Sequence, residues 1–310
     1  MARISILIPT RNRPDKLERL LESLTRSTVT PHEVLVVSSG QSIRSVVSRF
    51  KKSLPLKHMH TTLVGQISQK RLGIDNLSDD IDWCLFLDDD LILGSTAIQE
   101  ALLSISKFPD HEIIGIGLSL PVTSRASNVS RFFKLAGSFF YLYSNVPGKV
   151  LRSGYASSYS EQKNDCFSEW LNGASMWRAN ILSLYGNYLP STKHATCEDL
   201  IFSFSTRKFG KLLFSSKAKA FFQDGGFTNP NNVDIMESAA YWRYYFVSMN
   251  HELSKFAFFK SQFGRILFSI FQVERKYLKR VSTGVTTLFR LLIAESRKKD
   301  PLAILTKYVS

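Results

Sequence analysis

Short apolar runs alternate with segments of helical periodicity over the first 120 residues. Residues 4–8 form an apolar run that contains a single polar residue, Ser5, and residues 34–37 are entirely apolar, which is typical of strands buried on both faces. Between them, Pro14 opens a segment with leucines at helical spacing, at positions 17, 20, 21 and 24. The same criteria predict further strands at 56–59, 83–87, 113–120 and 212–222, and further helices at 43–50, 67–77, 91–107 and 198–208. This alternation predicts an α/β fold with a mostly parallel, Rossmann-like sheet flanked by helices, which binds ligands at the carboxyl ends of its strands.

The pattern changes twice along the rest of the chain. Residues 121–166 are rich in Ser, Asn, Gly and Tyr with weak periodicity, which favours loops and short strands. Beyond residue 232 the pattern becomes helical and strongly aromatic. We therefore expect one domain over residues 1–235, with a donor half (1–120) and an acceptor half (121–235), followed by a C-terminal helical extension over 236–310.

Composition excludes several classes of protein. The chain has 310 residues, 44% of them hydrophobic and 21% charged, which is ordinary for a globular protein and argues against disorder. Its three cysteines lie far apart, so they indicate neither a disulfide framework nor a closed zinc site and favour a reducing compartment. No stretch of about 18 residues is apolar enough to predict a transmembrane helix. These features predict a cytoplasmic protein, either free or peripheral on the inner face of the cell membrane.

The net charge of +14 favours an anionic partner. Residues 251–310 contain twelve basic and four acidic residues and carry +8 of this charge. Basic and aromatic residues alternate there: Arg265, Arg275, Lys276, Lys279 and Arg280 lie beside Phe263, Phe268 and Phe271. The pattern fits a helix on an anionic membrane surface, and equally an amphipathic helix packed on the domain with its basic face in water. No nucleic-acid-binding signature is present, so nucleic acid is not the expected partner.

The run LFLDDDL places three carboxylates directly after a buried strand. Asp88, Asp89 and Asp90 repel one another, and a hard cation relieves that repulsion. Because alternate side chains of an extended segment share a face, Asp88 and Asp90 are candidate ligands for one Mn²⁺ or Mg²⁺. The alternative is an acidic turn in which Asp90 caps a helix.

Five segments, in this order, resemble family 2 glycosyltransferases of the GT-A fold: ISILIPTRNRPDKLERLLESL, QKRLGI, LFLDDD, WLNGA and CEDLIFSFSTRKFGK. The resemblance covers about residues 3–225. It implies a metal-dependent, inverting transfer of a hexose from a nucleotide-diphosphate-sugar to a hydroxyl of a glycan or lipid-linked acceptor, in the assembly of a bacterial-type surface polysaccharide or glycolipid.

The resemblance also implies which residues bind the donor: Pro9, Thr10, Arg11, Arg13, Ser38, Lys70, Arg71, Asp88 and Asp89. Asp88 and Asp90 match the two acids of the family's DXD motif. Ser38 lies where the family commonly has an acid that accepts from the base, so the nucleotide is left open. Solvated loop arginines remain the alternative for Arg11 and Arg13, and an exposed helix face remains the alternative for Lys70.

The acceptor is assigned by the same resemblance to the WLNGA segment, at Trp170, Asn172, Gly173 and Ala174. A core tryptophan beside a turn glycine is the alternative. Glu198 and Asp199 match the family's acidic pair at a helix start, where Asp199 is the expected general base. The alternative is a pair of acids that suits the helix dipole.

Two departures from the family pattern keep other functions open. Many relatives carry a metal-binding histidine after the last strand, whereas this chain has FFQDGG. Asp224 or Gln223 is the substitute ligand, or the metal is held by the DXD acids and the donor alone. A sugar nucleotidyltransferase is a rival, although no glycine-rich loop follows the first strand. A catalytically inactive nucleotide-sugar-binding protein of the same fold is another.

Overall fold

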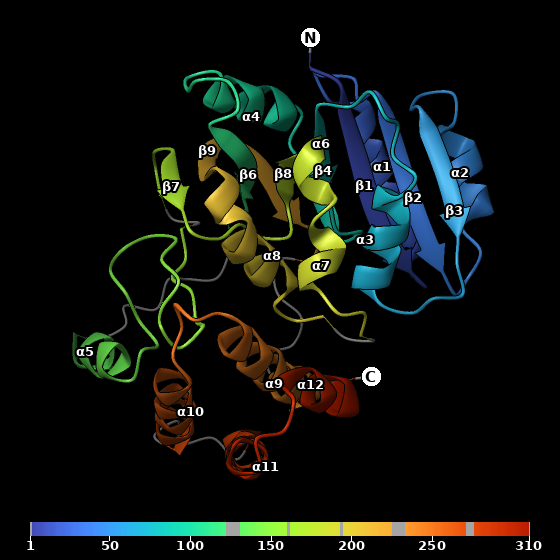
Figure 1. The fold of residues 1–310 in the computed structure, drawn as a ribbon. Coiled ribbons are helices and arrows are strands. Elements are labelled where there is room, and N and C mark those ends of the chain that lie inside the picture. Colours follow the sequence, from blue (N-terminus) through green and yellow to red (C-terminus); the bar gives the residue numbers. More distant parts are fainter. Residues whose placement is uncertain are drawn as a thin grey trace. The chain divides into compact units, whose positions relative to one another are not determined.

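The computed structural model describes residues 2–121, 131–159, 162–192, 195–224, 233–270 and 276–309. The chain forms two compact units (Figure 1). Unit 1 contains Met1–Arg125, Tyr159–Ser191 and Asp199–Gly226. Unit 2 contains Ala126–Ser158, Thr192–Glu198 and Phe227–Ser310.

Unit 1 is built on a mixed sheet. Its strands are β1 (Ile4–Arg11), β2 (Glu33–Ser39), β3 (Leu56–His60), β4 (Trp83–Phe86), β5 (Leu91–Leu93), β6 (Ile113–Ser119), β7 (Cys166–Ser168), β8 (Ser175–Arg178) and β9 (Lys211–Phe222). Its helices are α1 (Pro14–Thr25), α2 (Arg44–Phe50), α3 (Gln66–Ile74), α4 (Ala97–Ile105), α6 (Ala179–Leu182), α7 (Tyr185–Tyr188) and α8 (Glu198–Thr206), followed by the 3₁₀ turn Arg207–Phe209.

The strand order is β3-β2-β1-β4-β8-β6-β9-β5, with β7 paired to β9. Strands β3, β2, β1 and β4 run parallel to one another, so their carboxyl ends meet at one edge of the sheet. The expected mostly parallel sheet is confirmed in this half. In the other half β8 is antiparallel to both β4 and β6, and β5 and β7 are antiparallel to β9.

Successive side chains of β1 alternate between the two faces of the sheet, and each face is covered by helices. Ile4, Ile6 and Ile8 belong to one apolar cluster with buried residues of α1, α2 and α4. Leu7 points to the opposite face, where α3 packs. A Cβ at Gly73 of α3 would lie 2.2 Å from Leu7 Cδ1, so glycine is what allows this close approach. The sheet is therefore covered on both faces, as a buried parallel sheet requires.

The helix expected over residues 91–107 is partly wrong. Leu91–Leu93 forms β5, which pairs with the end of β9, and the helix α4 occupies only Ala97–Ile105. A short apolar run does not distinguish a strand from a helical turn, and the partner strand lies about 130 residues later in the chain.

Unit 2 is helical in the described residues. Its helices are α5 (Arg131–Phe139), α9 (Val233–Met249), α10 (Lys255–Ile270), α11 (Lys276–Ser296) and α12 (Pro301–Val309). The core of this unit is aromatic: Tyr241, Trp242, Tyr244 and Phe246 of α9 are fully buried. The helical C-terminal region is as expected. Helix α5 was not expected, because Gly137 and Ser138 interrupt the apolar pattern of a segment that reads as loop.

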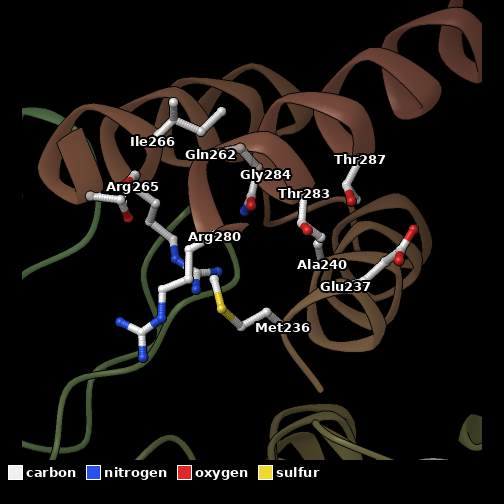
Figure 2. A pocket seen from close by; sticks show the side chains of 11 residues that line it. Met236, Glu237, Ala240, Gln262, Arg265, Ile266, Arg280, Thr283, Gly284 and Thr287 are labelled. Carbon is white, nitrogen blue, oxygen red and sulfur yellow. Dashed lines mark hydrogen bonds between the residues drawn. The ribbon is translucent and has the colours of Figure 1, made fainter. Parts of the chain in front are cut away.

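A pocket of about 40 Å³ lies between α9, α10 and α11 of unit 2 (Figure 2). Arg265 and Ile266 line it from α10, Met236 from α9, and Arg280 and Thr287 from α11. The guanidinium of Arg265 also donates to the Tyr155 hydroxyl at 2.6 Å. Two of the basic side chains expected on a solvent-facing helix surface thus line a pocket. Among the described helices, none has the length and apolar character needed to cross a membrane.

Candidate functional site

The loops after β1 and β2 are fastened together at the carboxyl edge of the sheet. Gln69 of α3 is buried and donates to the Thr10 carbonyl at 2.8 Å and to the Val37 carbonyl at 3.1 Å. In the loops themselves, the Asn12 side-chain oxygen accepts from the Gln41 backbone N–H at 2.8 Å. These contacts fix the strand ends where the ligand of such a sheet binds.

Ser38, at the end of β2, is fully buried. Its hydroxyl lies 2.9 Å from His58 Nε2 and 3.2 Å from His60 Nδ1, both on β3. Burial and the neighbouring His60 lower the pKa of His58, so a neutral imidazole faces Ser38 at neutral pH. At the position where the resemblance expects a base-binding acid, this chain therefore has a Ser–His–His group.

The acid loop, Asp88–Asp90, follows β4, and its middle residue points inward. Asp89 is 5% exposed, accepts from the Thr10 hydroxyl at 2.7 Å and lies 3.1 Å from the Arg13 guanidinium. Burial raises the pKa of this carboxyl, although the hydrogen bonds of Thr10 and Arg13 oppose the rise. Asp89 thus ties the acid loop to the loop after β1.

The flanking acids are more exposed. Asp88 accepts from Gln66 Nε2 at 2.6 Å, and Asp90 lies 3.6 Å from Arg13. Burial and the charge of Asp88 raise the pKa of Asp90, so the two carboxylates repel each other across the loop. A cation between them would relieve this repulsion.

Gln223, which follows β9, holds the acid loop from the other side. Its amide nitrogen donates to the carbonyls of Lys16, Asp89 and Leu91, at 2.9, 3.1 and 3.1 Å. Its backbone N–H also donates to the Asp90 carbonyl at 2.9 Å. The conformation of the acid loop therefore depends on a residue more than 130 positions away.

The WLNGA segment lies against the acid loop. A Cβ at Gly173 would be 3.0 Å from Asp88 Oδ2, so a glycine at this position leaves room for the carboxylate. The Asn172 side chain donates to the Leu118 carbonyl and accepts from the Ala174 N–H, at 2.9 and 3.1 Å. Ala174 is fully buried. Asn172 and Ala174 therefore fasten the segment and leave Gly173 beside Asp88.

Trp170 is partly buried, and its ring lies 5.0 Å from the ring of Tyr159 at 46°. The Tyr159 hydroxyl accepts from the Asn172 backbone N–H at 2.6 Å. Burial and the charge of Asp199 raise the pKa of Tyr159 well above its usual value, so Asp199 lies close enough to act on it.

Asp199 lies in the first turn of α8 and accepts from the N–H of Leu200 at 2.8 Å. Ser203, one turn later, donates to the Asp199 carbonyl and accepts from the Leu171 N–H, at 2.5 and 2.9 Å. The helix that carries Asp199 is thereby fixed to the segment that contacts Asp88. Glu198, the preceding residue, is buried.

The predicted cations lie in different environments. Arg11 is exposed, and Arg13 is half-exposed beside Asp89 and Asp90. Lys70 is 2% exposed, with its ammonium 5.2 Å from the centre of the Phe86 ring, so an exposed helix face is wrong for this residue. Arg71 is exposed on α3 and packs on Gly186 of α7.

The third predicted metal ligand, Asp224, forms an ion pair with Lys16 at 2.7 Å and is largely exposed. Within the described ranges, no three acidic, histidine or cysteine side chains converge as a ready metal site. Asp88 and Asp90 are oxygen donors suited to Mn²⁺ or Mg²⁺, and the carboxamide oxygen of Gln223 is buried without a hydrogen-bond partner. The residues present fit a cation that takes its other ligands from a bound donor.

The sequence pattern did not predict the contacts of several residues of the site. Gln66, Gln69, Gln223 and Ser203 are ordinary polar residues whose targets lie far away in the sequence. Gln69 and Ser203 lie within the QKRLGI and CEDLIFSFSTRKFGK segments, and Gln223 was a candidate metal ligand, but their contacts were not predicted. Long-range contacts of this kind become visible only in the folded chain.

Comparison with known proteins agrees with this geometry. Residues 5–155 match the model of glycosyl transferase family 2. An uncharacterized glycosyltransferase of Haemophilus influenzae is 31% identical over 112 residues, which are 36% of this chain and 37% of that protein. The chain therefore matches little more than a third of that relative's length.

Solved structures share the fold at low identity. A crystal structure of S. aureus TarS has a TM-score of 0.56 and 15% identity, over 92% of this chain and 81% of that one. The mannosyltransferase PcManGT from Pyrobaculum calidifontis, in complex with GDP-Man and Mn²⁺, has a TM-score of 0.56 and 11% identity, over 96% and 88%. The expected GT-A fold is confirmed by these likenesses. Residues 5–155 are thus similar to glycosyl transferase family 2, and the sheet has the GT-A fold.

Proposed function

We propose that the chain is an inverting glycosyltransferase that transfers a hexose from a nucleotide-diphosphate-sugar to an acceptor hydroxyl. The observation that carries this proposal is a chain of contacts across three motifs. Gly173 lies against the Asp88 carboxylate, and Ser203 connects the same segment to Asp199. A metal-binding acid and a candidate base are thus held on adjacent parts of one site, as displacement at a sugar requires.

In the proposed reaction Asp199 accepts the proton of the acceptor hydroxyl. The hydroxyl oxygen forms a bond to the anomeric carbon, and the bond from that carbon to the nucleoside diphosphate breaks on the opposite face. The leaving diphosphate takes the electron pair of the broken bond. A divalent cation held by Asp88 and Asp90 would neutralise charge on that diphosphate. Arg13, beside the same acids, is placed to add a further positive charge.

The donor class is supported by what related structures contain. S. aureus TarS has been solved in complex with UDP-GlcNAc, and PcManGT in complex with GDP-Man and Mn²⁺. Because the buried Ser38 hydroxyl lies beside two histidines, we leave the base of the donor open. For the acceptor, we propose a glycan or lipid-linked saccharide of a surface polysaccharide or glycolipid pathway.

The proposal is tested first by thermal-shift titration with UDP, GDP, dTDP and CDP, each with and without Mn²⁺. We expect one nucleotide to raise the melting temperature only when Mn²⁺ is present, because ligand binding stabilises the folded state. Asp88→Asn should abolish this shift. Asp79→Asn, which changes an exposed acid on a loop, is the matched control and should retain it.

The outcomes separate the rival functions. No shift with any nucleotide at millimolar concentration contradicts a donor site. If a nucleotide shifts the melting temperature but neither hydrolysis of the donor nor sugar transfer is detected with Mn²⁺, the chain is instead an inactive nucleotide-sugar-binding protein. Hydrolysis of the sugar–diphosphate bond, detected as free sugar, supports the transferase over a nucleotidyltransferase, which acts on the phosphate.

A further inference from the structure

One face of α10 carries large apolar side chains that remain exposed. Phe256, Phe263 and Ile270 are 73%, 51% and 57% exposed. They are seven residues apart, so together with Lys260 they form one stripe along the helix, which we call the α10 stripe. The opposite side of α10 is buried in unit 2, through Ala257, Phe258, Ser261, Gln262 and Gly264. Helix α10 is therefore apolar on two faces, and unit 2 covers one of them.

Helix α5 extends the α10 stripe. Leu135 and Phe139 lie one helical turn apart and are 74% and 62% exposed. The Lys260 ammonium lies 3.5 Å from the centre of the Phe139 ring, which places this ring beside the stripe. The next residue, Phe140, packs against Phe263 with 6.4 Å between ring centres. The two helices thus present a shared apolar surface.

The two segments that form this surface are basic. Residues 131–158 and 255–270 together contain seven lysines and arginines and no aspartate or glutamate. Of these, Lys134 is exposed on α5, and Lys260 lies within the α10 stripe. A second copy of the chain would bring like charges together on this surface, which disfavours self-association. An anionic lipid surface complements it, since aromatic rings enter the interfacial region while lysine heads reach phosphates.

We infer that the α10 stripe and the exposed side of α5 bind an anionic bilayer. The cations that serve this contact are Lys134 and Lys260. Arg265 and Arg280 lie elsewhere, because they line the pocket between α9, α10 and α11 (Figure 2). The inference extends the proposed function to a surface-bound protein, and it does not depend on transferase activity.

Flotation of the full chain with lipid vesicles tests the inference. Vesicles of pure phosphatidylcholine are compared with vesicles containing about a third phosphatidylglycerol, at low and high salt. We expect binding to the anionic vesicles that weakens at 0.5 M salt, because screening shortens the range of the lysine charges. Phe256→Ser combined with Phe263→Ser should reduce partitioning about tenfold or more, and Lys260→Gln severalfold.

Phe209→Ser is the matched control, because Phe209 is also exposed, at 49%, but lies in unit 1. This variant should bind anionic vesicles as the unmodified protein does. Melting temperature and nucleotide binding establish that each variant is folded. Failure of the unmodified protein to float with anionic vesicles overturns the inference, as does equal flotation of the double variant. Concentration-dependent dimers that the double substitution abolishes would identify a second copy as the occupant and also overturn it. Because no nucleotide is present during flotation, these outcomes do not bear on the transferase proposal.

Discussion

At the scale of single residues, the lack of a side chain at Gly173 leaves space for the Asp88 carboxylate. The resemblance assigns Gly173 to the acceptor site, and in the structure the Asp88 carboxylate lies directly against it. Small size was predictable, but its immediate neighbour was not, because Asp88 and Gly173 are 85 positions apart. The position of this carboxylate depends on the absence of a side chain opposite it.

Gly173→Ala should weaken metal-dependent nucleotide binding about tenfold or more. The added Cβ would lie 3.0 Å from Asp88 Oδ2 and push the carboxylate out of place. Nucleotide titrations with Mn²⁺ measure the effect. Gly284→Ala in unit 2 is the control, because its added methyl meets the side chain of Ile266, which is not part of the candidate site. Equal affinity in the two variants would contradict the role given to Gly173.

Asp199→Asn should lower the turnover number by about two orders of magnitude or more. The amide cannot accept the acceptor's proton, although its oxygen can still accept from the Leu200 N–H that the carboxylate now binds. Steady-state kinetics separate this from a binding defect, since the Michaelis constant for the donor and the melting temperature should change little. Normal turnover in the folded variant would remove Asp199 from the role of base.

At the scale of elements, Glu33 connects β1, β2 and β3 at the amino-terminal edge of the sheet. It begins β2, is 2% exposed, and accepts from the Ser5 hydroxyl of β1 at 2.6 Å. Lys57 of β3 lies 2.6 Å away, and Ser78 donates from both its N–H and its hydroxyl. Against the opposing effect of burial, these partners lower the pKa of Glu33 from 4.5 to about 2.

Glu33→Gln should lower the free energy of unfolding at pH 7 by about 2 kcal/mol, since buried partners lose a charged acceptor. Because the folded-state pKa is depressed, the stabilisation is complete above about pH 4.5 and is lost as pH falls toward 2. Denaturant titrations at several pH values should therefore show the difference from the unmodified protein narrowing below pH 4.5. Glu22→Gln, in an exposed pair with Arg26, should change stability little at any pH.

Elements with strong local patterns were predictable, and those that depend on distant partners were not. The strands β1, β2 and β6 and the helix α1 agree with prediction within a few residues, because buried apolar runs and leucine spacing are local signals. Strand β5 depends on pairing with β9, and α5 is obscured by Gly137 and Ser138. The acid loop was visible in sequence, but the contacts that hold it were not.

At the scale of the whole molecule, net charge predicted a basic C-terminal region without locating its cations. Arg265 and Arg280, two of the basic residues singled out in sequence, line a pocket inside unit 2. The aromatic residues also differ in exposure: both Phe263 and Phe268 contact Phe140, but Phe263 is exposed whereas Phe268 is partly buried. Sequence periodicity reports that a helix is amphipathic, but it does not say which apolar face another helix covers.

The position of β4 in the sheet has a consequence for biosynthesis. This strand is synthesised by residue 86, yet its neighbour β8 ends at Arg178, and the glutamine that fixes the acid loop is residue 223. While the ribosome makes the intervening residues, one edge of β4 has no native partner, and such edges recruit other strands. Translation must therefore pass residue 223 before the nucleotide-binding site is complete. A ribosome that pauses before that point leaves a nascent chain that needs protection from aggregation.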